Sequence, residues 1–239
     1  MSDSSKAEEM LFTRAGLDRN KVQGLVEGAL SGCDDGELFL EYKQSEALAW
    51  DDGRLKSASF DTSQGFGLRA VSDESTGYAH ASELSEAAIK RASDTVQSVR
   101  QGRSGTMADG PTGTNQSLYI DDNPLNDVPF GEKVKLLEEI DAYARSSDDR
   151  VRQVSASLAG SWQVVEILRA DGSRAGDVRP LVRFNVSVVL GEGDRQETGS
   201  FGTGGRTLYA DYLKPESWKA AIDEAMRQAD VNLSSVPAP

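Results

Sequence analysis

The sequence has very few of the residues that bind transition metals or form disulfide bonds. Among its 239 residues there is one histidine, His80, and one cysteine, Cys33. A disulfide needs two cysteines, so no internal bridge is expected, and the lone thiol favours a reducing compartment. A catalytic zinc site usually takes three ligands from His, Cys and carboxylate side chains. We therefore predict no metal site in this chain, and a structural role for His80.

The same shortage argues against nucleophilic catalysis. A serine or cysteine triad needs an imidazole base, and His80 is the one histidine of the chain. No Gly-x-Ser-x-Gly elbow surrounds any serine. The doubled acidic residues, such as Asp51 and Asp52, lie in turn signals, where solvated turn chemistry explains them better than paired acid–base catalysis. The sequence thus predicts no catalytic residue among positions 1–239.

Positive charge and long apolar runs are also scarce. The chain has 39 acidic residues against 26 lysines and arginines, a formal net charge of −13. Such a surface repels phosphate backbones and anionic lipid heads, which argues against nucleic-acid or membrane partners. No 18 apolar residues run together, and the beginning, MSDSSKAEEM, lacks the basic and apolar regions of a signal peptide. With the lone cysteine, these features predict a cytoplasmic protein.

What the sequence does contain is a succession of strand patterns. Residues 37–82 alternate apolar and polar side chains in a way that predicts four or five short strands. Residues 51–54, Asp-Asp-Gly-Arg, supply a hairpin turn. One helix is expected to begin at Asp18, and another at about Ser82 covers the strands.

The second half shows a similar layout. A helix is predicted after Pro129, and another starts near Pro215. Strands are expected at 151–158 and 162–169, around a turn at 159–161, and at 181–190 and 195–200, around a turn at 191–194. The fold class predicted is α+β, with two small domains that are each an antiparallel sheet covered by helices. Their expected bounds are residues 1–100 and 120–239, separated by a Gly-, Ser- and Thr-rich linker or loop at 101–119.

One glycine cluster is a candidate binding segment. Residues 199–206, GSFGTGGR, follow a predicted strand. A phosphate loop would require a helix to begin at once, and about ten residues intervene before the next one, which weakens a nucleotide interpretation. Two interpretations remain: a tight loop at the sheet end, or backbone that contacts an extended peptide or a neighbouring domain. The residues of this candidate contact are Gly202, Gly204, Gly205 and Arg206.

Trp50 is a second candidate contact. It stands just before the hairpin turn at 51–54. A tryptophan at such a position is either exposed, where it can anchor a partner, or part of the core. Both interpretations stay open from the sequence.

Two long segments resemble a known family. They read EYKQSEALAWDDGRLKSASFDTSQGFGLRAVSDESTGYAHASELS, at 41–85, and DDNPLNDVPFGEKVKLLEEIDAYARSSDDRVRQVSASLAGSWQVVEILRADGSRAGDVRPLVRFNVSVVL, at 121–190. The first is similar to the amino-terminal domain of the TldD/PmbA family of bacterial metallopeptidases, and the second to its middle domain. The TldD branch is the more similar one. The resemblance runs from about residue 10 to the end.

The resemblance implies a zinc-dependent peptidase that hydrolyses small or unfolded peptides together with a PmbA-type (TldE-like) partner subunit, as a heterodimer. In that family a helix with an HExxxH metal-binding motif follows soon after the point reached by Pro239, and no such motif occurs here. The chain 1–239 is therefore expected to be the inactive, non-catalytic part, which builds the chamber, contacts the partner and guides substrate. Sheet edges near 159–161 and 191–194 are the expected peptide contacts. The alternative is a stand-alone interaction module without peptidase activity.

Overall fold

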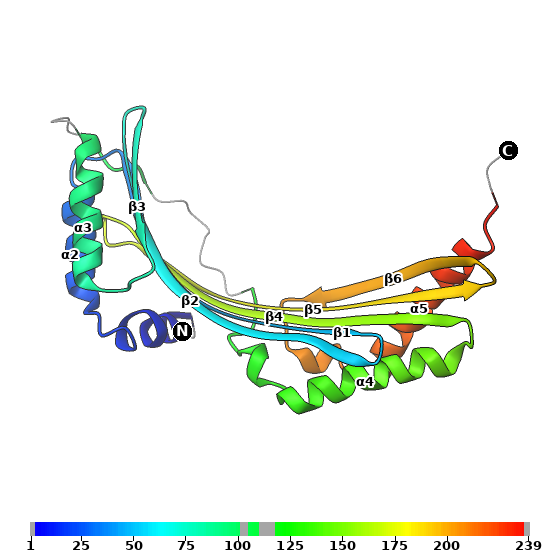
Figure 1. The fold of residues 1–239 in the computed structure, drawn as a ribbon. Coiled ribbons are helices and arrows are strands. Elements are labelled where there is room, and N and C mark those ends of the chain that lie inside the picture. Colours follow the sequence, from blue (N-terminus) through cyan, green and yellow to red (C-terminus); the bar gives the residue numbers. More distant parts are fainter. Residues whose placement is uncertain (1–2, 101–104, 110–117, 237–239) are drawn as a thin grey trace. The chain divides into compact units, whose positions relative to one another are not determined.

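The computed structural model describes residues 3–100, 105–109 and 118–236 (Figure 1). The helical elements are α1 (Asp3–Ala7), the π-helix η1 (Glu8–Thr13), α2 (Arg19–Leu30), α3 (Glu86–Val96), the 3₁₀ turns η2 (Gln97–Arg100), η3 (Pro124–Asn126) and η4 (Tyr209–Asp211), α4 (Phe130–Ser147) and α5 (Pro215–Leu233). The strands are β1 (Asp35–Asp51), β2 (Arg54–Ser72), β3 (Ser75–Ala81), β4 (Val151–Leu168), β5 (Arg174–Glu192) and β6 (Arg195–Gly205).

The strands form one six-stranded sheet in the order β3-β2-β1-β4-β5-β6, in which β2–β3 and β5–β6 pair antiparallel. The predicted α+β class is confirmed. The chain divides into two compact units: unit 1 comprises residues 1–44, 62–121 and 163–179, and unit 2 comprises 45–61, 122–162 and 180–239. Of the expected linker at 101–119, residues 101–104 and 110–117 lie outside the described residues, and a domain division there stays a prediction.

In unit 1, α2 and α3 pack against each other, and α3 packs against β3. Asp18 caps α2, because its side chain accepts hydrogen bonds from the backbone N–H groups of Asn20 and Lys21. The helix that was expected to begin near Ser82 begins at Glu86 instead, because the Ser85 hydroxyl accepts the N–H of Ala88 and so sets the first turn.

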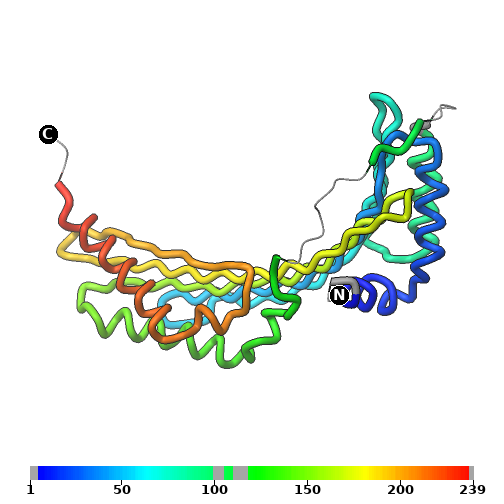
Figure 2. Tube along the Cα trace, turned by 180° about the vertical axis from the view of Figure 1, so that it is seen from behind, coloured from blue at the N-terminus to red at the C-terminus, as the bar shows by residue number. Residues whose placement is uncertain are grey.

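In unit 2, α4 and α5 lie side by side on the same face of the strands (Figures 1 and 2). Alternate residues of β4 and β5 point into the core beneath them, as the strand period of two requires. That core includes Val154, Ala156, Leu158, Val182, Phe184, Val186, Val188, Leu137, Ile140, Trp218, Ile222 and Ala225.

The strands are longer and fewer than the sequence predicts. The expected turn at 159–161 is wrong, because these residues lie inside β4, an 18-residue strand. A Cβ atom on Gly160 would stand 2.5 Å from Tyr209 Oη and 2.8 Å from Leu125 Cδ2, so this glycine marks close packing rather than a turn. Residues 37–82 likewise hold parts of three strands and not four or five.

The hairpin turns predicted at 51–54 and 191–194 are confirmed. Between β1 and β2, Asp52 and Gly53 adopt φ values of 49° and 82°, which Asp and Gly tolerate better than other residues. The β5–β6 turn falls at 193–194, inside the predicted segment 191–194, and the β4–β5 turn falls at 169–173.

The contact between β6 and α5 depends on a glycine. A Cβ atom on Gly199 would lie 1.9 Å from the carbonyl oxygen of Ala225 and 2.5 Å from the backbone nitrogen of Ala229. Both neighbours are helix backbone, which cannot rotate away as a side chain can. The absence of a side chain at position 199 therefore sets how closely α5 approaches the edge strand.

We predict that Gly199→Ala lowers the free energy of unfolding by about 1–3 kcal/mol, because the new methyl group forces α5 away from β6. Gly131→Ala is the matched control, since Gly131 lies in α4 and a Cβ atom on it would have no neighbour within 4 Å; we expect no loss there. Urea unfolding of both variants measures the difference. Equal stability of the two variants would contradict this account of the β6–α5 contact.

Candidate functional site

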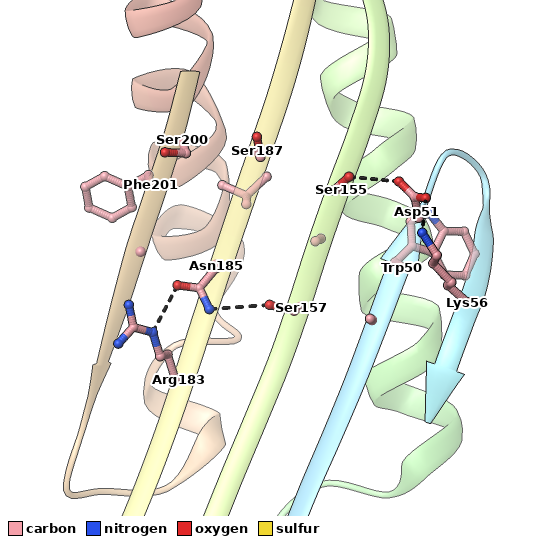
Figure 3. Close-up of a pocket in the computed structure, with 14 residues that line it drawn as sticks. Trp50, Asp51, Lys56, Ser155, Ser157, Arg183, Asn185, Ser187, Ser200 and Phe201 are labelled. Carbon is pink, nitrogen blue, oxygen red and sulfur yellow. Dashed lines mark hydrogen bonds and ion pairs between the residues drawn. The ribbon is translucent and has the colours of Figure 1, made fainter. Parts of the chain in front are cut away.

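The face of the unit 2 sheet opposite α4 and α5, which we call the open face, is lined by small and polar side chains. Figure 3 views it with the two helices behind the strands. Within the described residues no helix of unit 2 covers it. Its side chains include Asp51 from β1, Ser155 and Ser157 from β4, Arg183, Asn185 and Ser187 from β5, and Ser200 from β6.

Two adjoining hollows lie along these strands. One, of about 560 Å³, is lined by residues of β1, β2, β4, β5 and β6, and the other, of about 480 Å³, by residues of β5 and β6. Both are lined by Arg183 and Gly202. The open face thus offers a continuous surface of hydroxyl, amide and backbone groups that ends at the sheet edge formed by β6.

At the β1 end of the larger hollow, Asp51 is held by three donors. Lys56 Nζ, Gln153 Nε2 and Ser155 Oγ each donate a hydrogen bond to its carboxylate at 2.9 Å. The hydrogen bond from Lys56 is the largest cause that lowers the pKa of Asp51 to about 2, followed by those from Gln153 and Ser155. This carboxylate therefore stays ionised, and its proton affinity does not suit acid–base catalysis near neutral pH.

At the β6 end, three polar side chains are connected by hydrogen bonds. Arg183 Nε donates to Asn185 Oδ1 at 3.0 Å, and Asn185 Nδ2 donates to Ser157 Oγ at 3.3 Å (Figure 3). The amide fixes one edge of the guanidinium. The two terminal nitrogens of Arg183 lie on the side of β6.

The structure brings the predicted glycines together but not in a loop. Gly202, Gly204 and Gly205 belong to β6, where they pair with Asn185, Arg183 and Val182 of β5. The expectation of a loop after the strand was wrong, because the ladder with β5 continues to Gly205. Arg206 follows directly after the strand. Whether these residues contact a peptide stays a prediction.

Trp50 does not stand at the surface. It is 8% exposed and belongs to the hydrophobic core of unit 2, so the interpretation as an exposed anchor is wrong. Part of it nevertheless lines the larger hollow. Its indole Nε1 is buried without a hydrogen-bond partner among the described residues.

The sequence interpretation missed the candidate surface formed by Asp51, Arg183 and Asn185. A signal was present, since Arg183, Asn185 and Ser187 occupy alternate positions opposite the apolar residues of a predicted strand. What the sequence could not show is that β1 and β6 would bring Asp51 and Gly202 to the same hollow.

Sheet order corrects the expected peptide-binding edges. Residues 159–161 lie in β4, which has β1 on one side and β5 on the other, so that part of the prediction is wrong. The turn at 191–194 does lead into an edge strand, β6. The other edge of the sheet is β3.

The described residues do not fit a zinc site. His80 is exposed and stacks on Tyr78 with ring centroids 5.6 Å apart, whereas Cys33 is buried. No three His, Cys, Asp or Glu side chains gather to hold a metal ion in this part of the chain. None of the described helices has the length and hydropathy that a membrane span requires.

Comparison with known proteins gives consistent matches over most of the chain. Residues 36–98 match domain 1 of the PmbA/TldA metallopeptidases, and residues 123–233 match their central domain. A metalloprotease TldD homolog of Haemophilus influenzae is 36% identical over 214 residues, which are 86% of this chain and 44% of that protein. The chain spans about half the length of the curated relatives it matches.

Two solved structures share the fold. A Bacteroides thetaiotaomicron protein, named as a proposed modulator of DNA gyrase, superposes with a TM-score of 0.71 at 15% identity, covering 91% of this chain and 51% of that one. TldE from Thermococcus kodakarensis superposes with a TM-score of 0.64 at 15% identity, and the match covers 91% of this chain and 49% of that one. At this identity the likeness concerns the fold alone.

The hydrogen bonds to Asp51 give a prediction for its titration. Lys56→Met removes the strongest donor, so the pKa of Asp51 should rise from about 2 toward its ordinary value of 3.8. Because the folded-state pKa is the lower one, the ionised carboxylate stabilises the fold above pH about 4. That contribution disappears as the pH falls toward about 2.

Carbon-13 NMR of the Asp51 carboxyl group during a pH titration measures this pKa directly. Lys214→Met, which removes a lysine from the start of α5, is the control and should leave the Asp51 titration unchanged. An unaltered pKa in Lys56→Met would show that the three-donor arrangement does not exist in solution.

Proposed function

Because this chain belongs to the PmbA/TldD family of metallopeptidases, we propose that it forms the non-catalytic part of a peptidase that hydrolyses small or unfolded peptides. Its roles are to build the chamber, to contact the partner subunit and to guide an extended substrate. The observation that carries the proposal is the edge strand β6, which borders the open face of unit 2.

An edge strand offers backbone N–H and C=O groups that no neighbouring strand uses. An extended peptide can add to such an edge as a further strand, and main-chain hydrogen bonds then hold it without regard to its sequence. In β6, the glycines at 202, 204 and 205 keep side chains away from this edge. That combination suits a protein that takes in many unfolded peptides.

The chemistry of cleavage is assigned to another part of the protein. A zinc ion held by residues elsewhere in such a peptidase would supply a polarised water molecule for attack on the peptide carbonyl. We propose that the residues of this chain bind and orient the substrate. The hydrogen-bonded carboxylate of Asp51 at the end of the hollow fits this role, because a group that stays ionised near neutral pH positions ligands without exchanging protons.

A TldE-like subunit is the proposed partner, and the pair would work in the cytoplasm. The support for the partner is that TldE from Thermococcus kodakarensis has the same fold over 91% of this chain. The support for the compartment is the single cysteine, Cys33, which is compatible with a reducing environment.

Two proline substitutions in β6 test the peptide-binding edge. Along an antiparallel strand, successive N–H groups point alternately to the neighbouring strand and to the free edge. Of Ser200→Pro and Phe201→Pro, one therefore breaks the ladder with β5 and lowers the thermal stability, and the other removes an outward donor at little cost to folding. We expect the more stable variant to bind a short fluorescein-labelled Thr- and Val-rich peptide at least severalfold more weakly than the unaltered chain.

Fluorescence anisotropy measures the binding, and Ser200→Ala and Phe201→Ala are the matched controls that keep both N–H groups. Undiminished peptide binding by the more stable proline variant would exclude β6 as the docking edge. Mass spectrometry of the same samples, with zinc added, should find the peptide intact. Cleavage by a clean preparation of the chain would contradict the non-catalytic assignment.

A further inference from the structure

Arg183 is unusual among the arginines of this acidic chain. Many of the others pair with carboxylates, among them Arg19, Arg69, Arg145, Arg150, Arg169, Arg179, Arg195 and Arg227. Within the described residues Arg183 forms no ion pair, and its one side-chain hydrogen bond goes to the amide oxygen of Asn185. Both terminal nitrogens are left with their donors unused by described residues.

The guanidinium is nevertheless oriented by a hydrogen bond at one edge. Its Nε is bound at 3.0 Å by Asn185, which is itself bound by Ser157 on β4. A guanidinium fixed at Nε presents the two terminal nitrogens as a planar fork, and that fork matches both oxygens of a carboxylate. An arginine that loses less freedom on binding gives a stronger and more directional contact.

Gly202 provides the space for this arrangement. It pairs with Asn185 across the β5–β6 ladder. A Cβ atom there would lie 2.7 Å from Asn185 Oδ1 and 3.7 Å from Arg183 Nη2. Any other residue at position 202 would therefore press on the amide that orients Arg183. The lack of space beside Asn185 is therefore one reason for a glycine at position 202, in addition to its location on the edge strand.

We infer that Arg183 binds a carboxylate of the peptide that docks along β6, either its carboxy terminus or an acidic side chain. The main-chain hydrogen bonds of the edge do not depend on the peptide sequence, so this contact gives β6 a preference for peptides that carry such a carboxylate. This inference rests on the proposed function, which supplies the peptide. Arg183 lines both hollows of the open face, so an anion bound there would lie beside the edge strand. With a net charge of −13, the chain repels a singly charged carboxylate less than a doubly charged phosphate group.

Asn185 and Gly202 are positioning residues in this inference. They act through Arg183. Their substitution should keep the positive charge of Arg183 but leave its two terminal nitrogens without a fixed orientation. The inference therefore separates two effects: Arg183→Gln removes charge and fork together, whereas Arg183→Lys, Asn185→Ala and Gly202→Ala keep the charge and disturb the geometry.

The test uses two pairs of fluorescein-labelled Thr- and Val-rich peptides. In one pair the carboxy terminus is free or amidated, and in the other an internal residue is Asp or Asn, with all termini blocked. We expect the carboxylate member of at least one pair to bind about threefold to tenfold tighter than its neutral twin at low salt. The pair that shows the preference identifies the source of the carboxylate.

The preference should disappear in Arg183→Gln while the neutral peptides bind as before, and it should weaken in Arg183→Lys, Asn185→Ala and Gly202→Ala. Arg174→Gln, in unit 1, changes the net charge equally and should leave the preference unchanged. Equal binding of both members of each pair by the unaltered chain, or a preference that survives Arg183→Gln, would overturn the inference and leave the proposed function standing. Failure of all four peptides to bind would instead contradict the proposed function, and this inference with it.

Discussion

The packing of α4 and α5 on one face of the strands is the constraint on which the rest of unit 2 depends. Because side chains alternate along a strand, burying Phe184, Val186 and Val188 under the helices leaves Arg183, Asn185 and Ser187 on the other face. The close approach of α5 to Gly199 holds β6 in place at the edge. One apolar contact surface thus generates both the polar open face and the position of β6 at the edge of the sheet.

The cap of α2 and the turns at 51–54 and 191–194 could be predicted from the sequence, because they depend on a few neighbouring residues. Asp18 caps α2, and Asp52–Gly53 turn the chain between β1 and β2. Strand length could not be predicted, since Gly160 resembles a turn residue in isolation. Its real role is to admit Tyr209, which lies 49 residues further along the chain and whose hydroxyl would touch a Cβ at position 160. The prediction of a loop at the glycine cluster, residues 199–206, was wrong for the same reason, because contacts with β5 and α5 determine the conformation of this segment.

The burial of the charged residue Lys133 could not be predicted from the spacing of hydrophobic residues. Phe130, the apolar first residue of α4, is 52% exposed, whereas Lys133 in the same helix is fully buried. The ammonium group donates to Glu46 Oε1 at 2.6 Å and to the Leu125 carbonyl at 3.0 Å, and it lies 4.6 Å from the centre of the Tyr209 ring. Burial, and then the charge of Glu46, raise the pKa of Tyr209. Such a cluster forms only when β1, η3, α4 and η4 come together, and so it has no local signature.

The central claim is that this chain receives an extended peptide at the β6 edge and leaves its cleavage to residues elsewhere. Hydrogen–deuterium exchange with mass spectrometry, with and without the Thr- and Val-rich peptide, tests it most directly because main-chain pairing at an edge slows the exchange of its outward N–H groups. We predict slower exchange in residues 195–205 on peptide addition and no change in the opposite edge strand, residues 75–81. Protection at 75–81, or at neither edge, would contradict the account.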